Sequence, residues 1–349
     1  MALADLSLAV LMLALIAYAV LGGADFGAGF WDLTAGGSER GKRIGAQIRR
    51  SMTPVWEANH VWLIFVLVIF WTAFPTAFGA VMTTLYVPLF LASVGIIFRG
   101  TAFAFRGEAP GFSESRVLTV TFALSSILVP FFLGAAAGGI ASGNVPLHGA
   151  GGSIASWTNP TSLLVGALAV ATGIFLAAVY LAADSSRDGL DDLVAAFRRR
   201  ALGAALFTGA IALGGLLVVR ADTRPLYDGL TSGGGLAMVA ASALAAGATA
   251  LLIHGGRFEL ARVSAAAAVA TVVAGWVLAQ SPDLLPGELT LRQAAAGNTT
   301  LVALLISVGA GFLILGPSLV LLFRLKLSGR LDAGHGPPEQ GESSEIGPA

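Results

Sequence analysis

The residues best suited to chemistry stand at the start of one long apolar stretch, Ser51–Trp71, with the sequence SMTPVWEANHVWLIFVLVIFW. Its first turns hold Glu57, Asn59 and His60. A carboxylate, an amide and an imidazole are costly at the mouth of a membrane-spanning helix unless they face protein or water. Carboxyl and imidazole groups are the usual proton carriers in proteins. Glu57 and His60 are therefore candidates for a proton path.

Both residues also have a structural explanation. An acid in the first turn of a helix stabilises the positive end of the helix dipole by about 0.3–1 kcal/mol. A single histidine in a helix is more often packed in a core than used as a relay. Trp56 and Trp62, on either side, are typical of interfacial and packing aromatics. The sequence alone leaves both interpretations open.

A second acid follows the first apolar run, in the segment GGADFGAGFWD at Gly22–Asp32. We expect the first helix to end in this segment, which places Asp25 near the membrane boundary. Asp25 is then either an interfacial acid or a proton relay point beside Glu57. The spacing along the chain does not say whether the two carboxylates meet.

Composition limits the class of protein. The chain has 349 residues, of which 56% are hydrophobic and 11% charged, and its mean hydropathy is +0.82. A soluble domain has about a quarter charged residues, so this is a membrane protein. The formal net charge is zero, which gives no support for nucleic-acid binding. Cysteine is absent, so disulfides and thiolate metal sites are excluded. The first apolar run carries Asp5 and lacks a basic leader, so we do not expect a signal peptide.

Runs of about twenty apolar residues, enough to span a bilayer, recur along the chain. We predict an all-α integral membrane protein with nine transmembrane helices. They are Leu6–Phe26, Val55–Phe74, Phe78–Phe98, Val117–Gly138, Ser162–Ala183, Ala201–Val219, Gly235–Ile253, Ser264–Gln280 and Thr300–Phe323. Pro88, Pro130 and Pro317 fall inside these spans. Two small-xxx-small pairs, Gly23/Gly27 and Gly134/Gly138, would let helices approach closely.

The segments between the predicted helices differ in charge. Seventeen lysines and arginines fall in alternate segments on one side, and only Arg220, Arg224 and Arg292 on the other. By the positive-inside rule, the N-terminus lies outside and the C-terminus in the cytoplasm. We expect the basic residues Arg99, Arg106 and Arg198–Arg200 to set this topology and to contact lipid headgroups. Residues 1–330 form a single membrane domain, and 331–349 a disordered tail.

Five segments carry a resemblance to a known family. They read GADFGAG at Gly23–Gly29, PVWEANHVWLI at Pro54–Ile64, FRGTAFAFR at Phe98–Arg106, QSPDLLPGELTLRQAAAGNTTL at Gln280–Leu301 and GPSLVLLF at Gly316–Phe323. In order and in content they resemble subunit II of the cytochrome bd-type quinol oxidases. The resemblance extends from the first predicted helix to the last.

This resemblance implies two four-helix bundles plus one peripheral helix in a bacterial cytoplasmic (inner) membrane. The chain would pair with a homologous, haem-bearing subunit I in a complex that oxidises membrane quinol and reduces dioxygen to water without pumping protons. Haem b and haem d would all lie in subunit I. This chain would bind no cofactor directly, support assembly and haem retention, and lend a proton route from the cytoplasm. Membrane quinol and lipids would be further partners, while a structural quinone and a small accessory subunit are left open. Four histidines in the whole chain agree with a haem-free subunit.

The resemblance also assigns positions. Glu57 occupies the acidic position of a W-[DE]-x-N motif, and Asp25 is the aspartate of the DFGxG element. Many members carry another acid three residues before that aspartate, where this chain has Gly22. The departure weakens any route that needs two carboxylates there. The other matching positions are Trp56, Asn59, Trp62, Arg99 and Arg106.

Two other functions remain open at this stage. One is a proton-coupled secondary transporter, with Asp25 and Glu57 as coupling sites. Such transporters have broken helices with polar groups near the bilayer midplane, whereas these acids gather at one boundary. The other is a structural scaffold in which no residue moves protons.

Overall fold

The computed structural model describes residues 2–52, 56–105, 112–148 and 151–327. Contacts divide the chain into two units, Met1–Gly297 and Asn298–Ala349. The described residues contain eight single helices long and apolar enough to cross a membrane, or nine spans if one bent pair is counted as a span. The predicted all-α membrane fold is confirmed in this coarse form.

The N-terminal helix is longer than predicted. It comprises α1 (Ala2–Ala17), one π-helical turn η1 (Tyr18–Gly22) and α2 (Gly23–Leu33). The expectation that it ends within Gly22–Asp32 is wrong, because Gly23, Gly27 and Gly29 remain helical where other helices pack on them. Asp25 therefore lies inside a continuous helix.

The region of the second and third predicted spans is also rearranged. Helix α4 (Trp56–Ala73) is followed after Phe74 by the short helix α5 (Pro75–Thr84), and the two are bent by 120°. The predicted span Phe78–Phe98 is thus wrong at its start, because its first seven residues belong to α5. The third full span is α6 (Tyr86–Phe105), with Pro88 in its first turn and not mid-helix.

The remaining spans of the first unit contain the predicted ranges. They are α7 (Phe112–Ala141), α8 (Pro160–Arg187), α9 (Asp191–Asp222), α11 (Gly233–His254) and α12 (Phe258–Gln280). Pro130 lies inside α7 as expected. The amphipathic helix α3 (Glu39–Met52) and the short α10 (Arg224–Leu230) connect spans.

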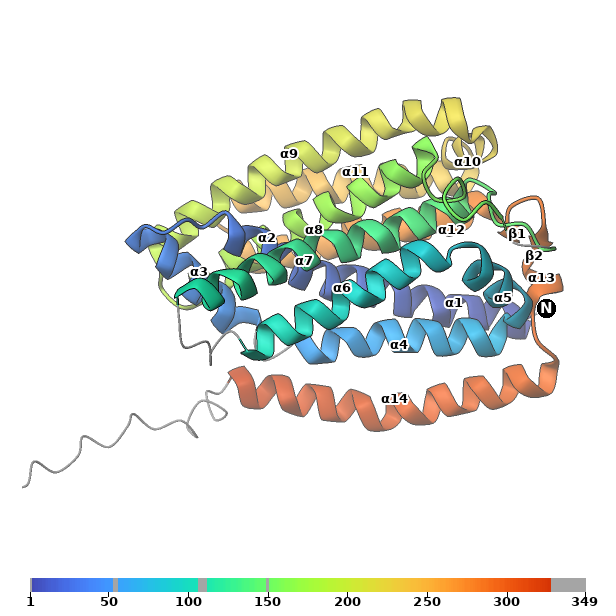
Figure 1. The fold of residues 1–349 in the computed structure, drawn as a ribbon, viewed down its shortest axis with the longest axis horizontal. Helices are drawn as coiled ribbons and strands as arrows, with labels where there is room; N and C mark the ends of the chain where they lie inside the picture. Colours follow the sequence, from blue (N-terminus) through green and yellow to red (C-terminus); the bar gives the residue numbers. More distant parts are fainter. Residues whose placement is uncertain (1, 53–55, 106–111, 149–150, 328–349) are drawn as a thin grey trace, which may run out of the picture. The chain divides into compact units, whose positions relative to one another are not determined.

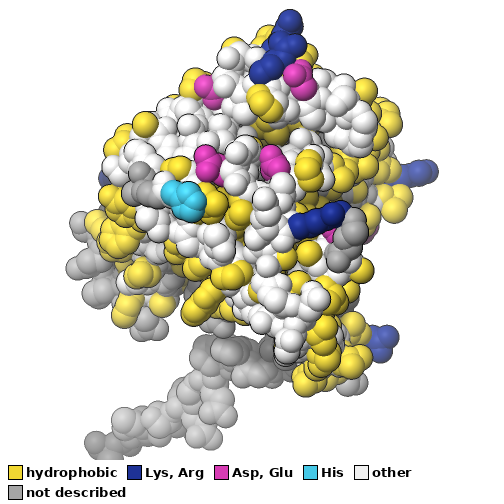
Figure 2. All heavy atoms as spheres, turned by 90° about the vertical axis from the view of Figure 1, so that its right-hand side faces the viewer, with side chains coloured by type: hydrophobic (Ala, Val, Ile, Leu, Met, Phe, Trp, Pro, Cys, Tyr) yellow, Lys and Arg dark blue, Asp and Glu magenta, His cyan; other side chains and the backbone are white. Residues whose placement is uncertain are grey.

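The polar segment after α12 folds into a small hairpin. Strand β1 (Asp283–Leu285) pairs antiparallel with β2 (Leu289–Thr290), and α13 (Leu291–Ala294) follows with a capping box at Thr290. This hairpin lies at the end of the first unit that also carries α10 (Figure 1). Viewed on that end, charged side chains are scattered among apolar and uncharged ones (Figure 2).

Helix α8 lies at the centre of the larger apolar core. Except for the partly buried Tyr180, its side chains from Phe175 to Ala183 are almost fully buried against residues of α2, α3, α9, α11 and α12. A smaller core joins η1, α2, α4, α6 and α7 around Tyr18, Phe26 and Val129. The second core surrounds the residues singled out from the sequence.

Two predicted glycine pairs mark close helix crossings. A Cβ atom on Gly27 would lie 1.9 Å from the carbonyl oxygen of Gly173, so α2 and α8 meet backbone to backbone. A Cβ atom on Gly138 would lie 2.5 Å from the Cα of Ser162, where α7 meets α8. Small residues permit such contacts, which bring the helices close enough for dispersion and backbone interactions.

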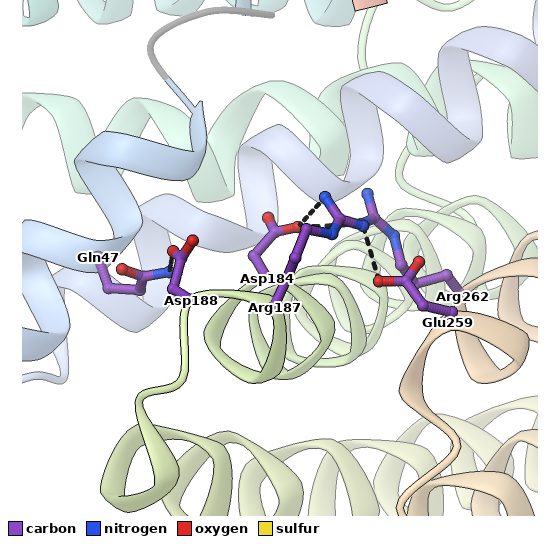
Figure 3. Close-up of polar contacts among 6 residues, drawn as sticks. All are labelled: Gln47, Asp184, Arg187, Asp188, Glu259 and Arg262. Carbon is purple, nitrogen blue, oxygen red and sulfur yellow. Dashed lines mark hydrogen bonds and ion pairs between the residues drawn. The ribbon is translucent and has the colours of Figure 1, made fainter. Parts of the chain in front are cut away.

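Polar contacts tie the ends of α3, α8 and α12 together (Figure 3). Arg262 Nη1 of α12 lies 2.9 Å from Asp184 Oδ1 of α8, and Arg187 pairs with Glu259 at 2.7 Å. Gln47 Nε2 of α3 donates to Asp188 Oδ2 at 2.8 Å. These partly exposed contacts fix helix ends, and individually each contributes little to stability.

The second unit contains α14 (Asn298–Leu327), a 30-residue helix with Pro317 in its interior. It covers the ninth predicted span, Thr300–Phe323. Large side chains such as Leu313 and Ile314 are exposed. The tail predicted to be disordered lies outside the described residues.

Candidate functional site

A buried ion pair joins two of the residues singled out from the sequence. Asp25 of α2 and Arg99 of α6 are 1% and 2% exposed. Arg99 Nη2 donates to Asp25 Oδ1 at 2.6 Å and to the Asp25 carbonyl oxygen at 3.3 Å. Arg99 Nη1 donates to the hydroxyl of Ser126 on α7. The guanidinium therefore links three helices.

Two aromatic rings enclose the guanidinium. The carbon Cζ of Arg99 lies 4.9 Å from the ring centroid of Phe26 and 4.4 Å from that of Phe122. Cation–π attraction of this kind strengthens when water is excluded. The rings hold the arginine in place and keep it from bulk solvent.

Polar atoms beside the pair are left without hydrogen bonds. Within the described part of the chain, Asp25 Oδ2, Arg99 Nε and the Tyr18 hydroxyl are buried with no partner. Buried polar atoms normally have partners, and such exceptions commonly mark a water position or a functional site. Among the described residues, the second carboxylate oxygen of Asp25 is therefore a buried acceptor without a donor.

His60, on α4, packs beside Phe26 and Tyr18, two of the residues that surround the Asp25–Arg99 ion pair. Its ring centroid is 5.8 Å from that of Phe26 and 6.4 Å from that of Tyr18. Asn59 is buried, and Trp62 packs against the small core. The structure thus brings Asp25, His60 and Arg99 into one neighbourhood, built from η1, α2, α4, α6 and α7.

Three other predicted residues cannot be placed in the same detail. Trp56 and Glu57 begin α4, but their side chains lie outside the described residues, as does all of Arg106. The backbone places Glu57 one turn before His60. The W-[DE]-x-N motif therefore lies in the first turn of α4, close in sequence to His60. The position of the Glu57 carboxylate stays a prediction.

The expectation for Arg99 was wrong. Arg99 was expected at lipid headgroups, but it is among the largest fully buried side chains of the described residues. Arg198 donates to the carbonyl oxygen of His254 at the end of α11, at 2.6 Å, and so acts as a helix cap. Arg99 stands within an apolar run, and such an intramembrane charge is itself a signal of a buried partner.

The sequence did not point to Tyr18, Ser126 or Phe122. Ser126 accepts from Arg99 and donates to the Phe122 carbonyl oxygen at 2.6 Å. A serine or tyrosine in an apolar helix gives little signal, because a hydroxyl can be satisfied by a backbone carbonyl of its own helix. The π-helical turn that begins at Tyr18 is a feature frequently found at functional sites, but sequence does not reveal it.

The His60 ring lies in an aromatic cluster, beside the rings of Tyr18 and Phe26. A haem iron would need an axial side chain whose free nitrogen faces an open space. Across the residues that the structure describes, no three His, Asp or Glu side chains gather as metal ligands. No step is assigned to a metal in this chain.

Ser126→Ala tests how much the serine contributes to the buried arginine. Loss of one acceptor for a buried charge is expected to lower the free energy of unfolding by about 1–3 kcal/mol. Heat denaturation of the purified protein in detergent measures the change. Ser93→Ala is the matched control, because the Ser93 hydroxyl bonds the Leu89 carbonyl of its own helix. Equal stability of both variants would show that Arg99 does not depend on Ser126.

Comparisons with known proteins agree with this architecture. A family model described as cytochrome bd terminal oxidase subunit II matches residues 3–326. A chain in the structure of bd oxidase from Geobacillus thermodenitrificans superposes with a TM-score of 0.79 and 27% identity, covering 94% of this chain and 99% of that one.

Curated relatives match over shorter ranges. Cytochrome bd ubiquinol oxidase subunit 2 of Bacillus subtilis is 29% identical over 119 residues, 34% of each chain. Cytochrome bd-I ubiquinol oxidase subunit 2 of Escherichia coli K12 is 28% identical over 174 residues, 48% of this chain and 45% of the relative. The chain thus aligns with less than half the length of these two. Because the family model covers nearly the whole sequence, the chain belongs to the cytochrome bd terminal oxidase subunit II family.

Proposed function

We propose that this chain is the haem-free subunit II of a bd-type terminal quinol oxidase. The complex would oxidise membrane quinol and reduce dioxygen to water, without pumping protons. The observation that carries the proposal is the match of the fold, over nearly the full length of both chains, to a chain of a solved bd oxidase. The partner would be a homologous subunit I whose haems b and d supply the redox chemistry.

The proposal includes the arrangement of the chain in the membrane. Helices α1–α2, α4, α6 and α7 would form one four-helix bundle, and α8, α9, α11 and α12 the other, with α14 as the peripheral helix. The smaller apolar core lies within the first bundle, whereas the larger core is centred on α8 and also includes residues of η1, α2 and α3. The N-terminus would lie outside and the C-terminus in the cytoplasm of a bacterial cell, with residues 1–330 as one membrane domain and 331–349 as a disordered tail.

Glu57, His60 and Asp25 would form a proton uptake path from the cytoplasm. Glu57 starts α4, His60 follows one turn later, and Asp25 lies beyond the rings of Phe26 and Tyr18. Asp25 already bonds Arg99 through Oδ1, so only its Oδ2 is available to a proton or a water. In this scheme Glu57 exchanges protons with solvent, while Arg99 holds the Asp25 side chain in position.

The other motif residues would have structural roles. Asn59 and Trp62 anchor α4 to the small core, and this chain would support assembly and haem retention through such packed surfaces. A structural quinone, a small accessory subunit and bound lipids would be further components of the complex.

Glu57→Gln tests the proton path. Loss of a proton-exchanging carboxylate with retained shape is expected to lower the rate of oxygen reduction about tenfold or more, because general acid–base groups contribute at least that much. Oxygen consumption with excess quinol measures the rate, and the reduced-minus-oxidised optical spectrum measures haem content. Glu39→Gln, an exposed acid of α3, is the matched control and should leave both unchanged.

Each possible result tests a different part of the proposal. A slow enzyme with normal haem bands supports a proton role for Glu57. Unchanged turnover removes that role and leaves the subunit as a scaffold. Haem bands in this chain purified without a partner would contradict the haem-free assignment. Absence of haem from both the chain and its copurified complex would favour a proton-coupled transporter.

A further inference from the structure

A small pocket lined by three arginines lies between α3 and α9. Its volume is about 240 Å³, and Arg40, Arg199 and Arg200 line it together with Ser38 and Gly41. No aspartate or glutamate is among its lining residues in the described part of the chain. Three guanidinium groups around one cavity form a site for a phosphate group, which they can bind through paired N–H donors.

Arg200 is held in this pocket by aromatic rings, and in the part of the chain that the structure describes it forms no ion pair. Its Cζ lies 5.1 Å from the ring centroid of Trp31 and 5.4 Å from that of Phe197. Its Nη1 is buried and, among the described residues, has no hydrogen-bond partner. A buried, unpaired guanidinium nitrogen is costly unless an acceptor reaches it. An anionic ligand would supply that acceptor.

Two acids of α3 and α9, the helices that line the pocket, are paired with other cations. Asp192 lies 2.9 Å from Arg43, and Glu39 lies 2.6 Å from Lys42. Arg40 donates to a backbone carbonyl, that of Asp192, at 3.4 Å. The pocket therefore keeps an excess of positive charge.

The start of α3 adds to this positive potential. The first turn of this 14-residue helix lines the pocket, and the Ser38 hydroxyl accepts from the Gly41 N–H at 3.1 Å. The N-terminal end of a helix dipole favours an anion. A Cβ atom on Gly41 would lie 2.2 Å from the Gly36 carbonyl oxygen, so the preceding loop packs tightly on the helix. The wall of the pocket is thus built from closely packed backbone.

Exposed apolar side chains of α9 near the pocket favour a lipid over a free anion as its ligand. Leu206 and Phe207 lie seven residues after Arg199 and Arg200, which places them on the same face of α9. These apolar side chains are 78% and 62% exposed. A ligand with a phosphate in the pocket could run its hydrocarbon chain along this face. We propose that the pocket binds the phosphate group of an anionic phospholipid at the membrane boundary.

Native mass spectrometry of the oxidase complex in detergent tests the site, with phosphatidylglycerol as the probe. The variant Arg199→Gln/Arg200→Gln is expected to bind it at least about tenfold more weakly than the unaltered complex, because each basic residue near a membrane surface contributes several-fold. Arg116→Gln, an exposed arginine of α7 outside the pocket, is the matched control and should bind as the unaltered complex does. Phosphatidylcholine at the same concentration should bind more weakly.

Three results would overturn the proposal. They are equal phosphatidylglycerol affinity in the double variant and the control, equal affinity for phosphatidylcholine, and displacement of the lipid by inorganic phosphate at a similar concentration. If the double variant fails to assemble because Arg200 no longer covers Trp31, Arg40→Gln/Arg199→Gln decides the question. Both of those side chains are exposed, and their loss is expected to weaken lipid binding about fivefold or more. An unchanged affinity in that variant would also reject the site.

Discussion

Arg99→Met is expected to destabilise this protein by about 3–5 kcal/mol, because it leaves the Asp25 carboxylate buried without its cation. The carboxylate is 1% exposed, and Arg99 donates both to its side chain and to the backbone carbonyl of the same residue. Water cannot replace the arginine easily, since Phe26 and Phe122 enclose the site. Asp25→Leu is expected to cost a similar amount, because it leaves the guanidinium buried without its anion.

The double variant Asp25→Leu/Arg99→Met separates the pair from its neighbours. Removing both charges leaves no buried ion without a partner. Replacing a buried ion pair by apolar side chains often leaves the stability of a protein unchanged. We therefore expect the double variant to be more stable than either single variant. If it also consumes oxygen at the normal rate, Asp25 has no place on the proton path.

Heat denaturation of the purified complex at a fixed heating rate measures these differences, with circular dichroism and haem release as the two signals. A fixed rate is needed because membrane complexes commonly unfold irreversibly. Arg116→Met is the control for loss of one arginine at an exposed position of α7. Single variants no less stable than this control would show that the Asp25–Arg99 pair does not hold the helices together.

Gly27→Val is expected to prevent α2 from reaching α8. The first added carbon would lie 1.9 Å from the Gly173 carbonyl oxygen and 2.2 Å from its carbon. These are backbone atoms in the middle of a helix, and no side chain can rotate away to make room. The two helices must separate, at a cost of about 3 kcal/mol or more. The loss of packing would extend to Asp25, which lies close by on the same helix.

The yield of folded complex after membrane extraction, and its denaturation temperature, measure this effect. Gly209→Val is the matched control, because a Cβ atom added at Gly209 of α9 would have no atom within 4 Å among its described surroundings. A normal yield for Gly27→Val would mean that α2 and α8 do not cross as closely as the structure shows. The yield and denaturation temperature of Gly27→Ala should lie between those of Gly27→Val and Gly209→Val, since alanine adds only the first carbon.

Hydropathy and charge alone determined the class of protein and most of its helices. Runs of twenty apolar residues signal spans because only helices and closed barrels satisfy their own backbone in lipid. The same signal does not mark where a helix bends or ends. Residues 78–84 lie in the same apolar run as those that follow, so only the structure separates α5 from α6 and shows the 120° bend between α4 and α5.

The sequence motifs likewise determined which residues to examine, but not their partners. Asp25 and Arg99 are 74 positions apart, and nothing local says that they meet. Their pairing depends on how α2, α6 and α7 pack, which depends on glycines and serines at the crossings. The position of Arg99 within an apolar run signals a buried partner, but the sequence does not identify that partner. Burial is a property of neighbouring helices, and it was decided by the tertiary structure.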